Sequence, residues 1–420
     1  MLTTATKWIG FEKDMVSNDQ FPSDTYYGYS LTEQIYTSEE IGQAGLIQSI
    51  AFQRSDDETW NQTRTLDVYL VHTDKSSFTD KTDWIIVTDA DKVFSGSVKL
   101  VNHSWTTITL NKPFAYNGTG NLAVIIDDNT NNYQNGVEFA CYTVDNSYQS
   151  MNQHSDGQNS DPTGTCYDGT TANAKNQLRI TFGLQLADNA NNSTVISDKH
   201  GQTTSVQLSG RTLYKDDKWN TLCLPFSLTT GQIAASPLAG CTLMELDGTT
   251  SNLTNGTLTL NFTTAESITA GTPYIIKWAE GDNIVDPAFS NVTIDKYLRP
   301  VEISEGKVSF TGTYVHQSFT EEDKDILFMG GENTLYYPQD GASIGAFRAY
   351  FQINSLIEGE EEDVKAFVLN FGDGTTAVTS LISREKEVEG GAYTLDGRKL
   401  NGKPAQKGIY IINGKKVAVK

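Results

Sequence analysis

The chain has 420 residues, 38% hydrophobic and 10% aromatic, which is enough for two or three domains with hydrophobic cores. Its formal net charge of −21 excludes a basic nucleic-acid-binding surface, because no positive patch would displace the counterions of a phosphate backbone. No apolar run approaches the roughly 20 residues of a membrane helix, so we expect no membrane span. The many Gly, Asn, Thr, Tyr and Ser residues favour an all-β fold rich in turns.

The first residues, MLTTATKWIGFEKD, lack the charged start, apolar stretch and cleavage site of a secretory signal. Two explanations are open: the protein stays inside the cell, or its signal is missing from this chain. We favour the second explanation because of features at the other end of the chain.

Residues 1–185 are predicted to form a first module, an antiparallel β-sandwich of jelly-roll-like type. Apolar residues alternate with polar ones in several segments separated by Gly, Asn and Asp turns, which is the period of half-buried strands. One short helical turn is expected at residues 36–42. The expected strands lie at residues 46–54, 65–73, 105–114, 121–129 and 175–184.

Aromatic residues in the expected loops of this module are candidate ligand-binding residues. Tyr26, Tyr27 and Tyr29 lie among polar residues, and Trp60 lies where we expect the tip of a hairpin. Exposed aromatic faces stack on sugar rings and also suit protein interfaces. The alternative is that these rings fold back onto the sandwich. Other tryptophans lie within strand patterns and are predicted to be in the core: Trp105, Trp219 and Trp278.

A polar loop after the fourth of these strands is the only candidate cofactor site. Asp127, Asp128, Asn129 and Asn131 would offer several oxygen atoms, the ligands that calcium prefers, although the spacing is not that of an EF-hand. The alternative is a turn in which these side chains bond their own backbone. We therefore expect no cofactor unless this loop binds calcium.

The rest of the chain is predicted to contain a second sandwich module between two linkers. Residues 186–202 are polar and are expected to be a structureless linker. Residues 203–372 repeat the strand pattern, with an acidic hairpin loop or disordered bulge at 357–365. Residues 373–391 are polar again and form the second expected linker.

Residues 392–420 are predicted to be a small β unit of three short strands. Its turns are marked by Asp396-Gly397, Asn401-Gly402 and Asn413-Gly414, the dipeptides that two-residue hairpins favour. A unit of this size holds no core of its own, so it must dock, oligomerise or be bound by another protein.

Neither the cysteines nor the histidines form a recognisable catalytic or metal-binding motif. There is no CxxC or HExxH sequence and no papain-like cysteine context, so zinc sites and an activated cysteine are not indicated. Cys141 with Cys166, and Cys223 with Cys241, are either local disulfides or buried free thiols. Carboxylates are numerous, but the sequence does not position the pair that a glycosidase needs.

The tail resembles the short C-terminal sorting domain of surface proteins from Bacteroidetes-type bacteria, which use the type IX (Por) secretion machinery. The resemblance rests on YTLDGR at 393–398, KGIYII at 407–412 and NGKKV at 413–417. It implies recognition by the secretion machinery and names a set of sorting residues: Gly408, Tyr410, Gly414, Lys415 and Lys416. This version is more compact than the full signal, and the last edge strand of the second module is the alternative explanation.

Both modules also resemble recurring units of the same multi-modular surface proteins. In the second module the matching stretches are GRTLYKDDKWNTLCLPF, AGTPYIIKW and GAFRAYF; in the first they include SLTEQIYTSEEIG, TLDVYLVHTDKSSF and NLAVIIDDNT. The resemblance implies an extracellular or outer-membrane-surface setting, and it carries no catalytic motif.

The leading hypothesis is a non-enzymatic, secreted or surface-displayed binding or adhesion protein. It would recognise a glycan or a host or matrix protein through the loops of the first module. Two alternatives stay open: the modules are architectural parts of a larger secreted hydrolase, or the chain is itself a glycoside hydrolase with paired carboxylates.

Overall fold

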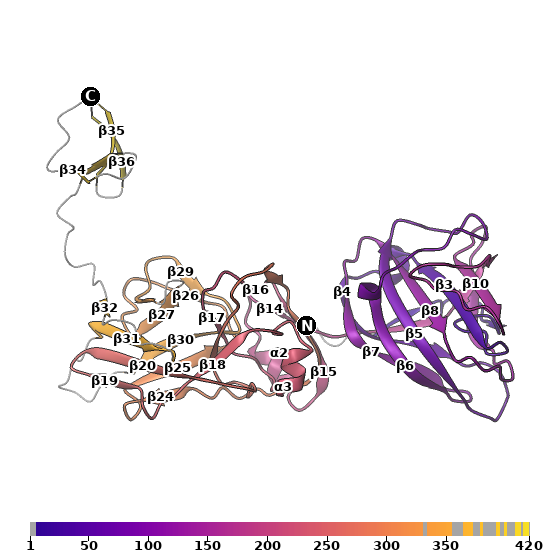
Figure 1. The fold of residues 1–420 in the computed structure, drawn as a ribbon, viewed down its shortest axis with the longest axis horizontal. Coiled ribbons are helices and arrows are strands. Elements are labelled where there is room, and N and C mark those ends of the chain that lie inside the picture. Colours follow the sequence, from indigo (N-terminus) through magenta and orange to yellow (C-terminus); the bar gives the residue numbers. More distant parts are fainter. Residues whose placement is uncertain are drawn as a thin grey trace.

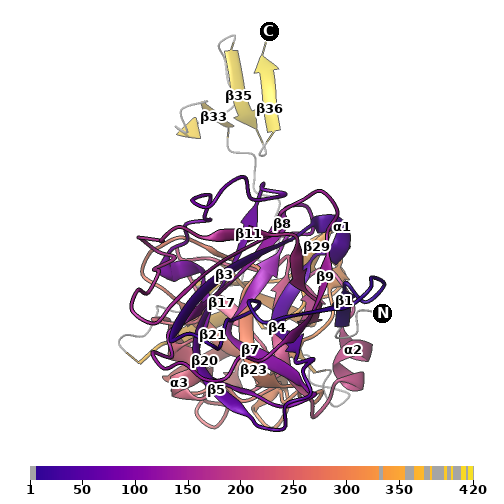
Figure 2. The same ribbon diagram turned by 90° about the vertical axis from the view of Figure 1, so that its right-hand side faces the viewer.

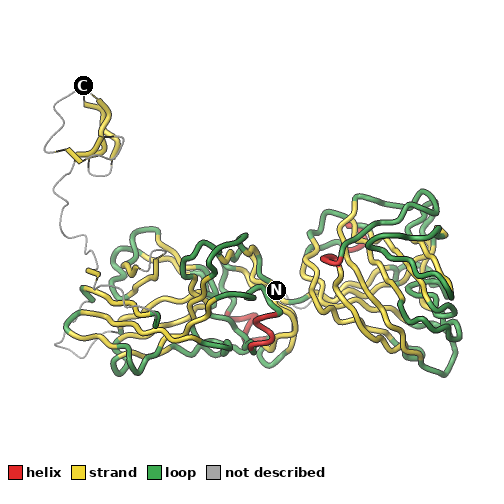
Figure 3. The backbone as a smooth tube through the Cα atoms, in the orientation of Figure 1, coloured by secondary structure: helices red, strands yellow, loops and turns green. Residues whose placement is uncertain are grey.

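The structure is a computed structural model. It describes residues 6–330, 334–354 and 364–372, together with the backbone of short strands between residues 379 and 419. The described residues are almost entirely in strands and loops, with a few short helices, so the predicted all-β fold class is confirmed (Figure 3). No helix in the described part is long and apolar enough to cross a membrane.

The first module is a sandwich of two main antiparallel sheets (Figure 1, Figure 2). The smaller sheet has the order β1 (Thr6–Ile9), β13 (Leu178–Phe182), β4 (Gly45–Gln53), β7 (Trp105–Tyr116). The larger has the order β11 (Thr170–Ala172), β10 (Ser150–Ser155), β3 (Tyr29–Tyr36), β8 (Asn121–Asp128), β5 (Gln62–Thr73), β6 (Lys92–Leu100). A third small sheet has the order β12 (Ala174–Asn176), β9 (Phe139–Thr143), β2 (Val16–Asn18).

The core of the first module lies between these two sheets. Leu66, Val68 and Leu70 alternate along β5 and are buried in it, as the period-two pattern predicts. The predicted helical turn is also present as α1 (Ser38–Ile41), with a reciprocal Thr37–Glu40 capping box at its start.

The outer faces of the two sheets differ, and this difference positions the surface sites described below. On the larger sheet, Phe78 and Trp84 from the segment after β5 cover Leu31 and Ile35, forming a second buried cluster. On the smaller sheet, the outer face carries exposed aromatic rings. Trp105 at the start of β7 belongs to them, so its predicted core position is wrong: it is half-buried among exposed rings rather than between the sheets.

The segment predicted to be a structureless linker at residues 186–202 is ordered and belongs to the second module. It contains the end of β14 (Leu184–Ala187), which pairs in parallel with β15 (Thr203–Ser209), and helix α2 (Ser193–Asp198). Asn192 holds the start of α2 by donating to the carbonyls of Ala187 (2.8 Å) and Tyr314 (3.1 Å). The Tyr314 carbonyl is 122 residues away in the sequence, so the polar composition did not reveal this structure.

The second module joins a sandwich to a smaller lobe that contains both helices of its described residues (Figure 1). The sandwich packs a seven-stranded sheet against a five-stranded one around a core of Leu, Ile and Phe residues. The seven-stranded sheet contains β17 (Asn220–Leu222), β21 (Tyr274–Lys277), β18 (Thr242–Leu246), β20 (Thr257–Thr264), β31 (Ala366–Asn370), β32 (Thr379–Ser380) and β19 (Asn252–Thr254). The five-stranded sheet contains β24 (Val301–Ile303), β25 (Val308–Thr313), β30 (Arg348–Ile353), β27 (Ile326–Gly330) and β28 (Thr334–Tyr336).

The lobe has its own hydrophobic cluster, to which α2 contributes the buried Ile196. The lobe consists of β14, β15, β23 (Ala288–Thr293), the pair β16 (Thr212–Leu213) and β22 (Ile284–Val285), and the helices α2 and α3 (Thr230–Ala234). A further pair joins β26 (Gln317–Phe319) to β29 (Ala342–Ile344). Gln48 of the first module accepts hydrogen bonds from Ser205 N (2.8 Å) and Thr204 Oγ1 (3.0 Å), so the two modules touch directly.

The C-terminal unit has four strands where we predicted three. Their order is β34 (Lys399–Leu400), β33 (Ala392–Thr394), β35 (Gly408–Ile412), β36 (Lys415–Val419), all antiparallel. Figure 1 shows β34, β35 and β36 away from the second module. The predicted turn dipeptides, most of the acidic loop at 357–365 and most of the linker at 373–391 lie outside the described residues; within that linker, β32 pairs with β31.

All four cysteines are free thiols, so neither of the two possible disulfides, Cys141–Cys166 and Cys223–Cys241, is formed in the structure. Cys141 and Cys223 are fully buried. Burial raises the pKa of the Cys141 thiol to about 12 and raises that of Cys223 further, so both are inert.

Candidate functional site

Three loops from distant parts of the sequence meet at one end of the first sandwich. They comprise residues 19–28, 54–61 and 129–138, and backbone hydrogen bonds join them. Gln134 N donates to Thr25 O (3.0 Å), and Ser55 N donates to Glu138 O (2.8 Å). We call this surface the loop end.

Buried Arg64 on β5 organises two of these loops from below. Its side chain has no exposed surface, and its Nε donates to Asp128 Oδ2 at 2.7 Å. The other guanidinium nitrogens donate to backbone carbonyls, Nη2 to Tyr27 O (2.8 Å) and Nη1 to Asn132 O (3.0 Å). A buried guanidinium is stable only when its charge and its donors are satisfied, so it holds the loop backbones in one arrangement.

Arg54, the residue directly after β4, holds the third loop in the same way. Its Nε and Nη2 both bond the carboxylate of Asp56 at 2.8 Å, and its Nη1 bonds Trp60 O at 2.6 Å. Its guanidinium carbon lies 4.8 Å from the centre of the Trp60 ring, and Trp60 Nε1 donates to Glu58 Oε2 at 2.9 Å. The indole is therefore fixed on one face and half-buried against the core. The loop joins β4 of the smaller sheet to β5 of the larger sheet, so the predicted hairpin tip at Trp60 is wrong, and Trp60 lies in a rigid connection between the sheets.

An open hollow of about 490 Å³ lies between these loops. Tyr133 is 67% exposed at its edge, and Trp60 forms another part of the wall. The remaining lining residues all carry side-chain amides: Asn61, Gln62, Gln134 and Asn135. Amides both donate and accept hydrogen bonds, and aromatic rings offer a flat apolar face. The wall thus matches the two kinds of surface that a sugar presents, hydroxyl groups and a C–H face.

The predicted tyrosines are not among the residues that line this hollow, and they differ in exposure. Tyr26 is 61% exposed. Its Cβ atom would lie 3.9 Å from a Cβ atom added to Gly136, so the Tyr26 side chain starts next to the 134–136 segment. Tyr27 is partly buried and stacks on His154, with ring centres 4.0 Å apart. Tyr29 begins β3 and is also partly buried. The structure therefore brings Tyr26 and Trp60 to one surface, with Tyr27 acting as a support.

Tyr133 was missed by the sequence reasoning, although it lies within the polar stretch considered for calcium. The signal available in the sequence was its position among asparagine and glutamine residues, which indicates an exposed loop. The calcium candidates themselves are not gathered at one point, because consecutive strand residues face opposite sides of a sheet. Asp128 points inward to Arg64, whereas Asp127 bonds Asn129 Nδ2 (2.7 Å) on the other face.

Asn131 has a left-handed backbone (φ 55°), and its N–H bonds Gly28 O at 2.8 Å. Among the described residues, no group of three or more His, Cys, Asp or Glu side chains is arranged to hold a metal ion. Calcium binding at this loop stays a prediction.

Burial raises the pKa of three carboxyl groups in this module. These groups lie inside the fold and not on the surface of the hollow. The pKa is about 8 for Glu33 and about 7 for Asp24 and Asp127, in each case chiefly because burial disfavours the charged form. Glu33 has no exposed surface and accepts a hydrogen bond from Ile85 N (2.9 Å), in the segment that covers the larger sheet. Such a side chain does not touch a ligand; it fastens the covering segment.

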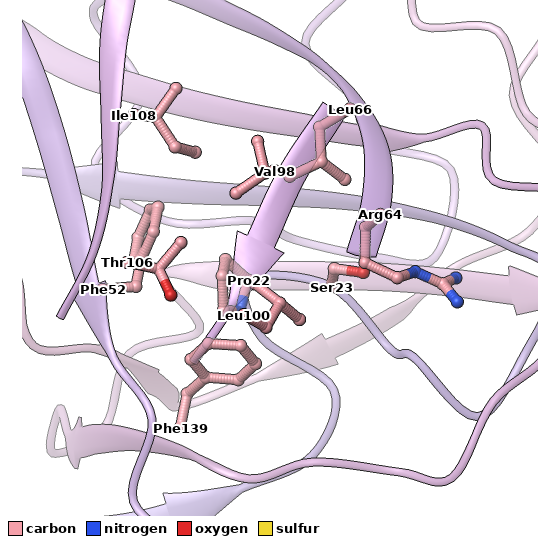
Figure 4. A pocket seen from close by; sticks show the side chains of 10 residues that line it. All are labelled: Pro22, Ser23, Phe52, Arg64, Leu66, Val98, Leu100, Thr106, Ile108 and Phe139. Carbon is pink, nitrogen blue, oxygen red and sulfur yellow. The ribbon is translucent and has the colours of Figure 1, made fainter. Parts of the chain in front are cut away.

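A small cavity of about 10 Å³ lies between the sheets and is lined mainly by apolar side chains (Figure 4). Arg64 lies at its edge with the guanidinium directed away from the apolar residues (Figure 4). The space is about the size of one water molecule, so it is a packing defect rather than a ligand pocket.

Of the residues named for sorting, Gly408 and Tyr410 lie in β35, and Lys415 and Lys416 lie in β36. Gly414 is outside the described residues.

Compared with known proteins, the chain matches no family model and no curated sequence. The fold and the loop end define an all-β protein with a rigid aromatic and amide surface.

Proposed function

We propose that the chain is a non-enzymatic binding protein that recognises a glycan at the loop end of its first module. The observation that supports this most directly is the hollow formed by Trp60, Tyr133 and four side-chain amides. Rings would contact the C–H face of a sugar, and the amides of Asn61, Gln134 and Asn135 would exchange hydrogen bonds with its hydroxyl groups. The fourth amide, Gln62, is buried and donates to Asn135 O, so it supports the wall.

The loops that carry these groups are held in place before any ligand arrives. Buried Arg64 and Arg54 fix the backbones on which Tyr27, Asn132 and Trp60 lie. A preorganised site loses less conformational entropy on binding, which favours a measurable affinity from a small contact area.

The charge around the hollow favours neutral sugars. Asp57 and Glu58 are exposed in the loop that carries Trp60, and Glu138 is exposed in the neighbouring loop. These carboxylates would repel an anionic ligand at close range.

The test is a neutral oligosaccharide array with the purified full chain, followed by titration of each hit. Tyr133→Ala and Trp60→Ala are expected to weaken binding about tenfold or more, the effect of losing a buried aromatic contact at a binding site. Tyr148→Ala is the matched control, because Tyr148 is also exposed (55%) but outside the three loops. Unchanged affinity in both loop variants would refute the site, and repeating the titration with a chelator tests calcium.

We also propose that the protein is secreted or displayed on the cell surface and that residues 392–420 are its sorting signal. The support is the resemblance of the tail together with its separate four-stranded unit. In a bacterium with type IX secretion, a truncation before residue 392 is expected to stay inside the cell while the full chain is exported. Equal export of both forms would contradict this.

A further inference from the structure

A second aromatic surface lies on the open outer face of the smaller sheet of the first module. Trp8 of β1 is 43% exposed and Phe11, in the following loop, is 41% exposed. Trp105 of β7 completes the group: its ring centre is 5.3 Å from that of Trp8 and 5.6 Å from that of Phe11. We call these three rings the sheet platform.

Arg179 of β13 lies among these rings. Its backbone is paired with Trp8, and its guanidinium carbon is 5.4 Å from the centre of the Trp8 ring and 4.9 Å from that of Trp105. Its Nη2 donates to Thr107 Oγ1 at 2.7 Å. The guanidinium is thus held over two indoles by cation–π contacts while it stays partly exposed.

This arginine has no acidic partner among the residues that the structure describes. Arg54, Arg64, Arg299 and Arg348 each form an ion pair with an aspartate, whereas no described carboxylate lies within ion-pair distance of Arg179. The net charge of the chain is −21, so an exposed arginine without a carboxylate partner stands out. Its free donors suit a carboxylate, which a guanidinium binds through short, charge-assisted hydrogen bonds.

We propose that the sheet platform is a second glycan site and that it takes acidic polysaccharides whose sugars carry a carboxylate. The rings would contact the apolar face of a hexuronate, and Arg179 would bind its carboxylate. The exposed hydroxyl-bearing residues Thr107 and Thr109 on the same face of β7 would bond its hydroxyl groups. This site is distinct from the hollow in place and in charge, because the hollow is bordered by carboxylates.

The test uses the full chain with polygalacturonate and alginate at physiological salt. The methyl ester of polygalacturonate is the matched probe, because it keeps the sugar rings and removes the negative charge. We expect at least one of the two acidic polymers to bind and the ester to bind about tenfold or more weakly. Failure of both acidic polymers, or equal binding of polygalacturonate and its ester, would overturn the proposal.

Variants then locate the site. Arg179→Gln and Trp8→Ala are expected to lower affinity for the acidic polymer about tenfold, while Tyr133→Ala at the hollow leaves it unchanged. Arg179→Lys keeps the charge, so its affinity for the acidic polymer is expected to lie between that of the parent and that of Arg179→Gln. Unchanged binding in Arg179→Gln refutes the assignment, and if that variant does not fold, the ester comparison on the unaltered chain decides. Binding to poly-glutamate but to neither polysaccharide would replace the proposal with an acidic peptide.

Discussion

Replacing Arg64 by methionine is expected to destabilise the first module by about 3–5 kcal/mol, the usual effect of removing one partner of a buried ion pair. Both side chains of the Arg64–Asp128 pair have no exposed surface, so Asp128 would keep a buried charge without its partner. The carbonyls that Arg64 holds in the loops are partly buried and regain water, so they add less than about 1 kcal/mol each.

Asp128→Asn tests the same pair from the other side. It leaves the arginine buried without its counter-charge and is expected to be destabilising by a similar amount. The double variant buries neither charge alone, so its loss should be about 2–3 kcal/mol smaller than the sum of the two single losses.

Hydrogen exchange of the full chain measures these losses module by module. Peptides from β5 and β8 should lose protection, whereas peptides from β25 and β30 in the second module should not change. Lys112→Met, at an exposed lysine of β7, is the control and should stay within about 0.5 kcal/mol of the parent. If the two single losses add to the double loss within about 0.5 kcal/mol, the pair is not coupled and the reasoning is wrong.

Two further predictions concern ionisation and the thiols. Glu33 holds its proton up to a pKa of about 8 in the folded chain but only to about 4.5 when unfolded, so its contribution is fully present below pH 4.5 and is lost as pH rises through 8. The melting temperature of Glu33→Gln should therefore fall less between pH 5 and pH 9 than that of the parent; parallel curves would contradict the assignment. For the thiols, a colorimetric thiol reagent without reductant should titrate all four cysteines after unfolding, while Cys141 and Cys223 stay protected in the native chain. Only two thiols after unfolding would indicate a disulfide.

Much of the fold follows from local patterns in the sequence. Alternating apolar residues predicted β4, β5, β7 and β8 to within a few residues, because a strand with one face in a core needs that period. The helical turn α1 was also predictable, since Thr37 and Glu40 have capping-box spacing and Gly42 suits the left-handed residue after a helix. The all-β class needed no more than these signals together with the turn residues.

The candidate sites were predictable only in part. Tyr26 and Trp60 were recognised as loop aromatics, but their meeting with Tyr133 depends on contacts between loops roughly 80 to 110 residues apart, Ser55 with Glu138 and Thr25 with Gln134. Trp105 was not predictable either. An aromatic residue in an alternating strand faces either the core or the open face of a sheet, and the alternation does not show which of the two faces it occupies.

The sequence by itself determined the all-β class, the long strands β4, β5, β7 and β8 and the acidic charge, because each depends on neighbouring residues or on composition. The tertiary structure decided which loops share one end, that Arg64 neutralises Asp128, that Arg179 pairs with none of the described carboxylates, and that residues 184–198 belong to the second module. These features arise from pairs far apart in the chain, whose contacts depend on strand register and sheet order. Local periodicity carries no information about either, so the chemistry of both surfaces appeared only in three dimensions.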